Sequence, residues 1–378
     1  MFENLEDRRL LAIVGLGING DSLSDEYSSE WYSYARNWDE LLATPRAVNL
    51  GTFANWGEPR REGYEYNWAR SGADSGTLLL QGQHTGLAAQ INAGKVSHAV
   101  LAIGQNDFSP LGLAYDSIYN DSWDEDDIKA YVDTVVANIT TALATLTSAG
   151  ADVVLSSIVD NGVTPLTQSY YSNAGQRERV AAVLDGIRTR LEGLGDLYNV
   201  PVADLFGLVR ALTGTNTEPI PSQVIGGQVF KNGCNPLDTD GSEPEWFFVH
   251  DCYHPNTVPQ ALFANLMMTA FNLGYGEDLT LFSEREMVEL VGLAYGGSDT
   301  LDINYSDFVY LPTAAALDFG DAPDPSYPTL LANNGARHTL VAGFHLGASI
   351  DAEADGRPDA QALGDDNDGS DDEDGVQL

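Results

Sequence analysis

The chain has 378 residues, with 56 acidic and 18 basic side chains and a formal net charge of -38. Such a surface repels nucleic acid and anionic membranes, because both bind proteins through basic patches, and we expect neither as a partner. No apolar run reaches the roughly 20 residues that a membrane-spanning helix needs, so no transmembrane segment is expected. The length of the chain allows one large domain with an appendage or two domains, and its 43% hydrophobic residues are enough for a sizeable core.

The first residues, 1–12, carry acids ahead of two arginines and therefore lack the basic-then-apolar order of a secretory signal. The segment Leu5-Glu6-Asp7-Arg8-Arg9-Leu10-Leu11 resembles a short Leu-Glu-x-Arg-x-Leu-Leu leader found near the start of many exported planctomycete proteins. An ordinary charged extension is the alternative interpretation. The resemblance implies a secreted or cell-surface bacterial protein.

A buried strand is expected next, because residues 10–18 are almost wholly apolar. Gly20 and Asp21 break this run, and residues 24–26 are suited to cap a helix that starts just after it. Ser22 is thereby placed at the carboxyl edge of a sheet, where open α/β sheets bind their ligands. A serine in such a turn is more often only a helix cap, so its position alone does not decide between the two roles.

Strands and helices alternate along the rest of the chain. Further strands are predicted at 45–50, 99–103, 153–159 and 200–205, and helices at 27–42, 78–91, 126–149, 177–194 and from 257 to about 273. Residues 51–63 indicate a surface loop, and 213–245 a long ordered loop or small lid. The alternation predicts a parallel sheet with helices on both faces.

Two residues of these segments are candidates to stabilise a negative charge. Gly72 lets the backbone N–H approach a ligand closely, and Asn106 follows the strand 99–103, at the same sheet edge as Ser22. For each there is a purely structural alternative: Gly72 opens the next helix, and Asn106 is a turn residue.

Asp251 and His254 form a second candidate pair, because their three-residue offset lets a carboxylate reach an imidazole on the same short turn, which Pro255 then fixes. A metal site that includes His250 is the rival interpretation. No further His or Cys cluster supplies a third set of ligands, which disfavours it.

Four stretches, in chain order, resemble the signature blocks of the GDSL or SGNH family of serine esterases and lipases. They are Gly20-Asp21-Ser22-Leu23, Asn67-Trp68-Ala69-Arg70-Ser71-Gly72-Ala73, Gly104-Gln105-Asn106-Asp107 and Asp251-Cys252-Tyr253-His254-Pro255. The resemblance implies a three-layer α/β/α sandwich of the flavodoxin-like type. It implies that Ser22, His254 and Asp251 form a catalytic triad, with an oxyanion hole made by Ser22, Gly72 and Asn106.

The resemblance also implies hydrolysis of carboxylic esters through an acyl-enzyme, without a cofactor for catalysis. The substrate would be a small-molecule, lipid or acylated carbohydrate ester. Trp31, Trp38 and Trp68 favour a sugar or aryl ester among these, as far as they lie near the site. The alternative function is a non-catalytic extracellular binding or matrix module on a hydrolase fold.

Cys234 and Cys252 are the only cysteines. A disulfide between them would tie down the segment that carries Asp251 and His254, with a stabilisation of about 3 kcal/mol. Two separate buried thiols are the alternative, and an exported location favours the disulfide.

The composition changes near residue 317, after which acids and glycines dominate. Asp351, Glu353 and Asp355 place oxygens at alternate positions before a glycine, as a calcium loop does, and Asp359 follows. Ala362 stands where an EF-hand carries its closing glutamate, and a plain acidic tail is the alternative. This segment also resembles a module of planctomycete surface proteins. The sequence thus predicts a leader-like segment 1–12, a hydrolase domain with extension 13–312 and an acidic tail 313–378.

Overall fold

The computed structural model describes residues 13–30, 32–312, 317–320, 322–324, 326–330, 337–339 and 356–360. The chain divides into two units, Met1–Leu311 and Pro312–Leu378. In the second unit, β10 (Leu317–Phe319) pairs antiparallel with β11 (Arg337–Thr339). The leader-like segment 1–12 and most of the acidic tail lie outside the described residues.

A five-stranded sheet in the order β1-β4-β5-β6-β9 forms the centre of the first unit. Its strands are β1 (Leu16–Gly20), β4 (His98–Ala102), β5 (Asp152–Ser156), β6 (Val202–Ala203) and β9 (Val309–Tyr310). The first four are parallel, and β9 is an antiparallel edge strand that the sequence did not predict. The carboxyl ends of β1, β4 and β5 therefore meet at one edge of the sheet.

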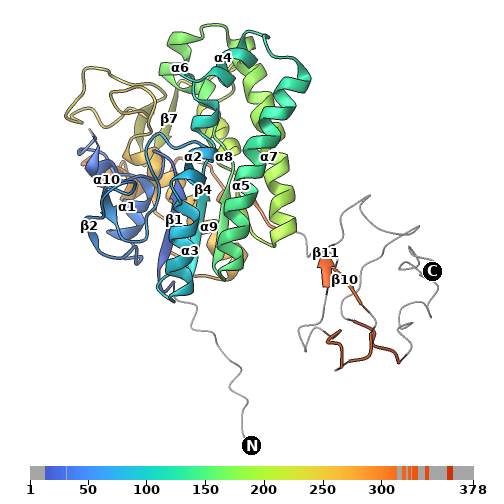
Figure 1. Cartoon of the computed structure of the whole chain (residues 1–378). Coiled ribbons are helices and arrows are strands. Elements are labelled where there is room, and N and C mark those ends of the chain that lie inside the picture. Colours follow the sequence, from blue (N-terminus) through green and yellow to red (C-terminus); the bar gives the residue numbers. More distant parts are fainter. Residues whose placement is uncertain are drawn as a thin grey trace, which may run out of the picture. The chain divides into compact units, whose positions relative to one another are not determined.

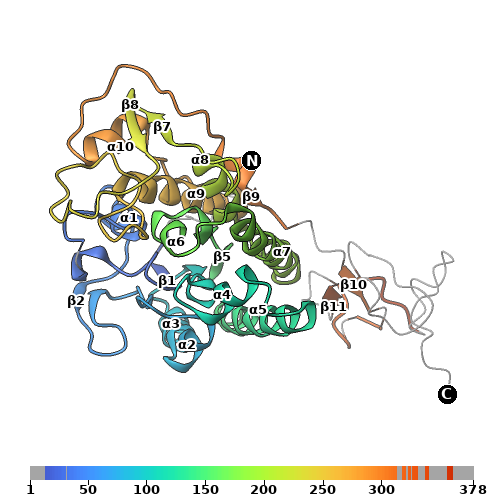
Figure 2. The same ribbon diagram turned by 90° about the horizontal axis from the view of Figure 1, so that it is seen from above.

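Helices cover both faces of this sheet, as predicted. Because side chains alternate along a strand, Val100 and Val154 face one core, whereas Leu101 and Leu155 face the other. Figures 1 and 2 show α3 (Gln83–Asn92), α5 (Glu125–Ser148) and α7 (Ala174–Tyr198) on one side of the sheet, with α1 (Trp38–Ala43), α9 (Thr257–Tyr275) and α10 (Glu284–Leu290) on the other. The expected α/β/α sandwich is confirmed, with a mixed rather than purely parallel sheet.

Shorter elements complete the first unit. They are η1 (Tyr27–Ser29), α2 (Ser75–Leu80), η2 (Asn106–Phe108), α4 (Leu113–Tyr119), η3 (Asn161–Val163), α6 (Pro165–Tyr170), α8 (Leu205–Thr213) and η4 (Tyr305–Phe308). In the part of the chain that the structure describes, no helix is both long and apolar enough to span a bilayer.

The predicted helix over 27–42 is wrong for most of its length, since only η1 and α1 form there. The carboxylates of Asp25 and Glu26 do not cap a helix but accept the backbone N–H groups of Ser71 and Tyr64, at 2.7 Å each. The helix start moves to Asn37, whose side chain caps α1. Acidic residues after the serine turn therefore join distant segments to it.

Other predicted boundaries change for local reasons. The helix expected over 78–91 is split into α2 and α3 at Gly82, which has a left-handed φ of 69°. Residues 45–50 are buried at Val48 and Leu50 but form no regular strand. The loop predicted over 51–63 contains the hairpin β2 (Phe53–Asn55) and β3 (Glu62–Tyr64).

The long loop predicted over 213–245 also contains a hairpin. β7 (Ser222–Ile225) pairs with β8 (Gln228–Lys231) through a two-residue turn at Gly226 and Gly227. Both glycines have positive φ, as a hairpin turn of this length requires. Two adjacent glycines between short β-prone runs were the signal for this turn.

Candidate active site

Ser22 lies in the turn that follows β1, at the edge where the parallel strands end, and is 8% exposed. The N–H of Leu23 and the N–H of Ser24 donate to the side chain and the carbonyl of Asp21, both at 3.0 Å. A Cβ at Gly20 would lie 2.8 Å from the carbonyl oxygen of Ala102, so only glycine fits there. The serine is thus held on a tight, well-bonded turn.

Three of the predicted side chains form one chain of hydrogen bonds. His254 Nε2 lies 2.8 Å from Ser22 Oγ, and His254 Nδ1 lies 2.5 Å from Asp251 Oδ2. Burial alone would raise the pKa of Asp251, but the bonds from His254 and Tyr32 outweigh it and lower that pKa below its ordinary value. Asp251 is therefore an anion wherever His254 is to act as a base.

The turn between β8 and α9 directs the side chains of Asp251 and His254 toward Ser22. Asp251 Oδ1 accepts the backbone N–H groups of Tyr253 at 2.8 Å and His254 at 3.0 Å, and the His254 carbonyl accepts the N–H of Val249 at 2.9 Å. The carboxylate therefore braces its own turn and leaves its second oxygen for the imidazole.

Gly72 follows a segment that runs beside β1. The N–H of Trp68 donates to the Ile18 carbonyl at 2.8 Å, and that of Arg70 to the Gly20 carbonyl at 3.1 Å. Gly72 itself has a left-handed φ of 83°, which favours glycine. This pairing carries the Gly72 backbone toward the serine turn.

Asn106 begins η2, just beyond the end of β4. Its side-chain nitrogen Nδ2 donates to the carbonyl of Ala73 at 2.9 Å, which ties it to the residue after Gly72. Since an amide nitrogen carries two hydrogens, one remains to be donated to a ligand. Ser22, Gly72 and Asn106 thus all lie on loops at the same edge of the sheet.

A protein-family model described as GDSL-like Lipase/Acylhydrolase matches residues 17–267. The chain belongs to this family. Its description is that of enzymes that hydrolyse esters. No curated protein matches this GDSL hydrolase.

Solved structures with a similar fold include three hydrolases. A putative acylhydrolase from Bacteroides fragilis is 12% identical, with 68% of this chain and 86% of that chain covered and a TM-score of 0.39. The esterase EstA from a Pseudoalteromonas species is 16% identical, with 70% and 99% covered and a TM-score of 0.35. An extracellular lipase from Streptomyces rimosus is 16% identical, with 68% and 99% covered and a TM-score of 0.37.

Two buried residues of the GDSL hydrolase connect the parts of the site, and the sequence analysis missed both roles. Asp21 accepts the backbone N–H of Leu23 at 3.0 Å, and the backbone of Gln105 is near enough to lower the pKa of the Asp21 carboxyl, so Asp21 lies between the serine turn and the Asn106 turn. Asn161 donates to the Phe108 carbonyl at 3.0 Å and accepts the Tyr253 hydroxyl at 2.9 Å. Asn161 follows β5, a post-strand position like that of Asn106, and this was the available signal.

Of the three tryptophans Trp31, Trp38 and Trp68, the two that the structure describes make packing contacts and give no support to a sugar or aryl ester. Trp38 is buried, and its indole N–H donates to Ser24 Oγ at 3.1 Å. The Trp68 indole donates to Gln90 at 2.9 Å, and its ring packs against the guanidinium of Arg60. Trp31 lies outside the described residues. The two described side chains are therefore packing residues.

The rival metal interpretation receives no support from the residues that the structure describes. His250 Nδ1 lies 2.9 Å from the Tyr34 hydroxyl, and no group of three or more His, Cys, Asp or Glu in the described ranges is arranged to hold a metal ion. For the predicted calcium loop, Asp351, Glu353 and Asp355 lie outside the described residues, and only Asp359 is within them. The calcium site stays a prediction.

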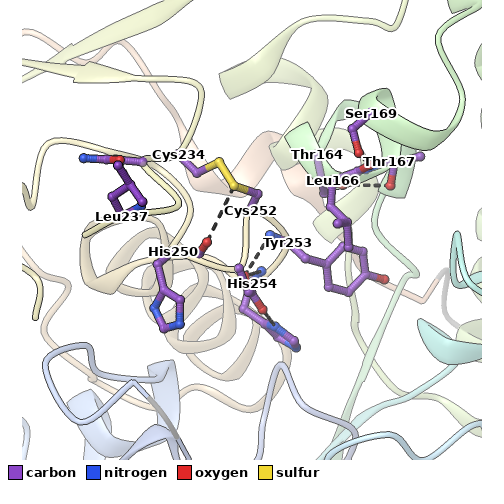
Figure 3. Close-up of a disulfide and its surroundings, with 12 residues drawn as sticks. Thr164, Leu166, Thr167, Ser169, Cys234, Leu237, His250, Cys252, Tyr253 and His254 are labelled. Atoms are coloured by element: carbon purple, nitrogen blue, oxygen red, sulfur yellow. Dashed lines mark hydrogen bonds and ion pairs between the residues drawn. A yellow bond between two sulfur atoms is a disulfide. The ribbon is translucent and has the colours of Figure 1, made fainter. Parts of the chain in front are cut away.

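Cys234 and Cys252 form a disulfide, which decides between the two alternatives. Figure 3 shows it beside the turn that carries His250, Tyr253 and His254. Cys252 has a left-handed φ of 65°, and its carbonyl accepts the N–H of Leu166 at 2.9 Å. The disulfide thus holds an unfavourable backbone conformation between Asp251 and His254.

Reduction of this disulfide is expected to lower the free energy of unfolding by about 3 kcal/mol, because it releases a loop with a sequence separation of 18. Urea unfolding with and without dithiothreitol measures the difference. The double variant Cys234→Ser/Cys252→Ser serves as the control, since its stability should not respond to the reductant. Equal midpoints for the oxidised and reduced wild type would contradict the expectation.

Burial raises the pKa of several carboxyl groups around the site. The pKa values are about 6 for Asp25, Asp107 and Asp160, about 7 for Asp21 and about 8 for Glu26. These groups keep their protons in the folded protein at pH values where the unfolded chain has lost them. Their contribution to stability is therefore complete below about pH 4 and is lost progressively as the pH rises through the folded pKa values, with the last of it lost near pH 8.

The free energy of unfolding is accordingly expected to fall by about 2 kcal/mol or more between pH 5.5 and pH 8.5. Thermal or urea unfolding across this range measures it. Glu26→Gln is the matched control, because it removes the group with the highest of these pKa values and should flatten the upper part of the curve. Stability that rises with pH over the same interval would contradict the assignment.

Proposed function

We propose that this GDSL hydrolase cleaves carboxylic esters with Ser22 as the nucleophile, His254 as general base and acid, and Asp251 as the group that orients His254. One observation carries the proposal: the continuous hydrogen-bonded line from Ser22 Oγ through both nitrogens of His254 to Asp251 Oδ2. A serine hydroxyl becomes a useful nucleophile when an oriented imidazole accepts its proton.

In the acylation step, Ser22 Oγ forms a bond to the ester carbonyl carbon while His254 Nε2 takes the hydroxyl proton. The carbonyl oxygen becomes an oxyanion, for which the N–H groups of Ser22 and Gly72 and the Asn106 amide are the proposed donors. His254 then gives its proton to the alcohol oxygen as the carbon–oxygen bond breaks. The alcohol leaves, and an acyl-Ser22 ester remains.

Deacylation repeats this sequence with water. His254 removes a proton from water, the resulting oxygen bonds to the acyl carbon, and the same donors meet the second oxyanion. The bond to Ser22 Oγ breaks as His254 returns the proton to it. Asp251 stays ionised throughout, because its pKa is lowered below the ordinary value. Its negative charge stabilises the imidazolium form of His254.

We propose that the substrate is a small-molecule, lipid or acylated carbohydrate ester. We also propose that the protein is secreted or attached to a bacterial surface.

The mechanism is tested by the hydrolysis of p-nitrophenyl acetate, butyrate and octanoate by the wild type and by Ser22→Ala. Turnover by the wild type alone supports the mechanism, and the order of the three rates separates short-chain from long-chain preference. Equal turnover by the wild type and Ser22→Ala would overturn the proposed mechanism.

A further inference from the structure

Tyr32 makes a contact that the mechanism above does not use. Its hydroxyl donates to Asp251 Oδ2 at 2.6 Å, the same oxygen that lies 2.5 Å from His254 Nδ1. The hydroxyl also lies 3.4 Å from His254 Nδ1. Tyr32 is far from both residues in the sequence and outside the four signature stretches, so its position is a product of the fold.

We propose that Tyr32 is a positioning residue of the triad: it holds the Asp251 carboxylate in line with His254 and draws negative charge from the oxygen that both groups share. This inference deepens the proposed ester hydrolysis and rests on it. Tyr32 does not touch the reacting atoms and acts through Asp251.

The Asp251 carboxylate has its acceptor sites filled. Oδ1 accepts hydrogen bonds from two backbone N–H groups of its own turn. Oδ2 accepts one from His254 Nδ1 and one from the Tyr32 hydroxyl. An ionised carboxylate offers about four such sites. With all of them used, the carboxylate cannot rotate without breaking bonds on both oxygens, and the direction of its bond to His254 is set.

The Tyr32 hydroxyl remains a donor over the whole range in which the enzyme would be assayed. Burial, and next the charge of Asp251, raise the pKa of Tyr32 well above its ordinary value. The phenol therefore stays protonated. Since Asp251 is ionised and has no hydrogen to give, the bond between them has only one direction, from Tyr32 to Asp251.

Aromatic neighbours hold the Tyr32 ring. The ring centroid lies 5.2 Å from that of Tyr27 in an edge contact, and 5.6 Å from each of the rings of His250 and His254. These contacts involve the ring and not the hydroxyl. Phenylalanine at position 32 can therefore keep the packing while losing only the bond to Asp251.

The bond from Tyr32 has a definite effect on the protonation of His254. The hydrogen bond from Tyr32 to Asp251 is stronger when His254 is neutral, because no neighbouring cation then offsets the charge of Asp251. The bond is weaker when His254 is an imidazolium. Tyr32 thus favours neutral His254, the form that accepts the Ser22 proton. Removing the hydroxyl should therefore move the acid limb of the pH–rate profile, the side on which activity falls as the pH is lowered, to higher pH.

Other titratable groups also face this assembly, and all of them are unchanged when Tyr32 is replaced. They include Asp21 beside Ser22, Glu30 and Tyr34 near Tyr32, Tyr27 near Asp251, His250 against the Tyr32 ring and Tyr253 against the His254 ring. A shift between variants therefore reports the Tyr32 hydroxyl and not these neighbours.

The experiment compares the pH dependence of kcat and kcat/KM for the wild type, Tyr32→Phe and Tyr34→Phe with p-nitrophenyl acetate. Tyr34 is the matched control, because its hydroxyl contacts His250 at 2.9 Å on the same turn but not Asp251 or His254. Tyr32→Phe should lower kcat about tenfold with little change in KM, and move the acid limb about 0.5 unit to higher pH. Tyr34→Phe should leave that limb in place.

An acid limb in Tyr32→Phe that coincides with that of the wild type would overturn the inference, whatever the loss of rate, because a merely structural role lowers activity without moving the limb. Where Tyr32→Phe does not fold, 3-fluorotyrosine at position 32 keeps the packing and strengthens the donor, and should move the limb to lower pH. An unmoved limb in that protein would equally overturn it.

The failure of the proposed function has a separate signature. In that case neither the wild type nor Ser22→Ala hydrolyses the ester. The inference about Tyr32 is then still decided by proton NMR titration of the His254 ring in the wild type, Tyr32→Phe and Tyr34→Phe. A shift to higher pH in Tyr32→Phe alone supports it, and identical curves in the three proteins contradict it.

Discussion

Replacing His254 by alanine is expected to lower kcat for ester hydrolysis by about 10⁵ to 10⁶-fold, the largest effect of any substitution that leaves Ser22 in place. The imidazole is the group within hydrogen-bonding distance of Ser22 Oγ that can accept its proton, at 2.8 Å. Without it, the hydroxyl must attack while still protonated. Steady-state kinetics with p-nitrophenyl acetate measures the loss.

His250→Ala is the control for this substitution. His250 lies on the same turn, but its Nδ1 contacts the Tyr34 hydroxyl and not the serine. Its removal should change kcat no more than a few-fold. A His254→Ala protein that retains a tenth of the wild-type rate, while His250→Ala loses most of it, would exclude His254 as the base.

Replacing Asn106 by alanine is expected to lower kcat by about 10² to 10³-fold with little change in KM. The donor would act on the charge that develops on the ester oxygen, and this charge is absent from the bound substrate. The fold should persist, because within the part of the chain that the structure describes the side chain bonds only to the Ala73 carbonyl. Kinetics and a melting curve on the same sample separate the two effects.

Asn106→Asp provides a second comparison at this position. It preserves the shape of the side chain but replaces a donor by a negative charge, so the rate should fall at least as far as in Asn106→Ala. An unchanged rate in either variant would remove Asn106 from the oxyanion hole.

The sheet and its longest helices could be predicted because their signals are local. The apolar run that includes β4 and the periodic apolar face of α5 each specify one element without reference to the rest of the chain. Ser22, Asn106 and Asp251 could be chosen as candidates for a related reason, since each follows a strand or precedes a helix within a short recognisable stretch.

Residues that act across long sequence distances were missed. Asp25 and Glu26 look like helix caps in sequence, but their partners, Ser71 and Tyr64, lie some forty residues away. No sequence pattern singles out Tyr32, because its partner Asp251 lies 219 residues away. Such contacts cannot be predicted from local sequence patterns, because they depend on how distant loops pack together at the edge of the sheet.

The disulfide also combines a feature that the local sequence indicates with one that depends on the fold. The sequence places Cys252 between the candidate acid and base, but whether Cys234 reaches it depends on the path of the β7–β8 hairpin and the loop behind it. That path is set by Gly226 and Gly227 and by the packing of Phe230 and Phe247 in the core. Only the assembled fold brings the two cysteines together.

The most direct test of the account is to treat the wild type with a fluorophosphonate and to locate the modified residue by peptide mass spectrometry. Such reagents form a stable adduct with a serine that an adjacent base has activated. We expect one adduct per chain, on Ser22, that is absent from Ser22→Ala and forms much more slowly in His254→Ala. An adduct on another residue, or equal labelling of the wild type and Ser22→Ala, would contradict the assignment of Ser22 as the nucleophile.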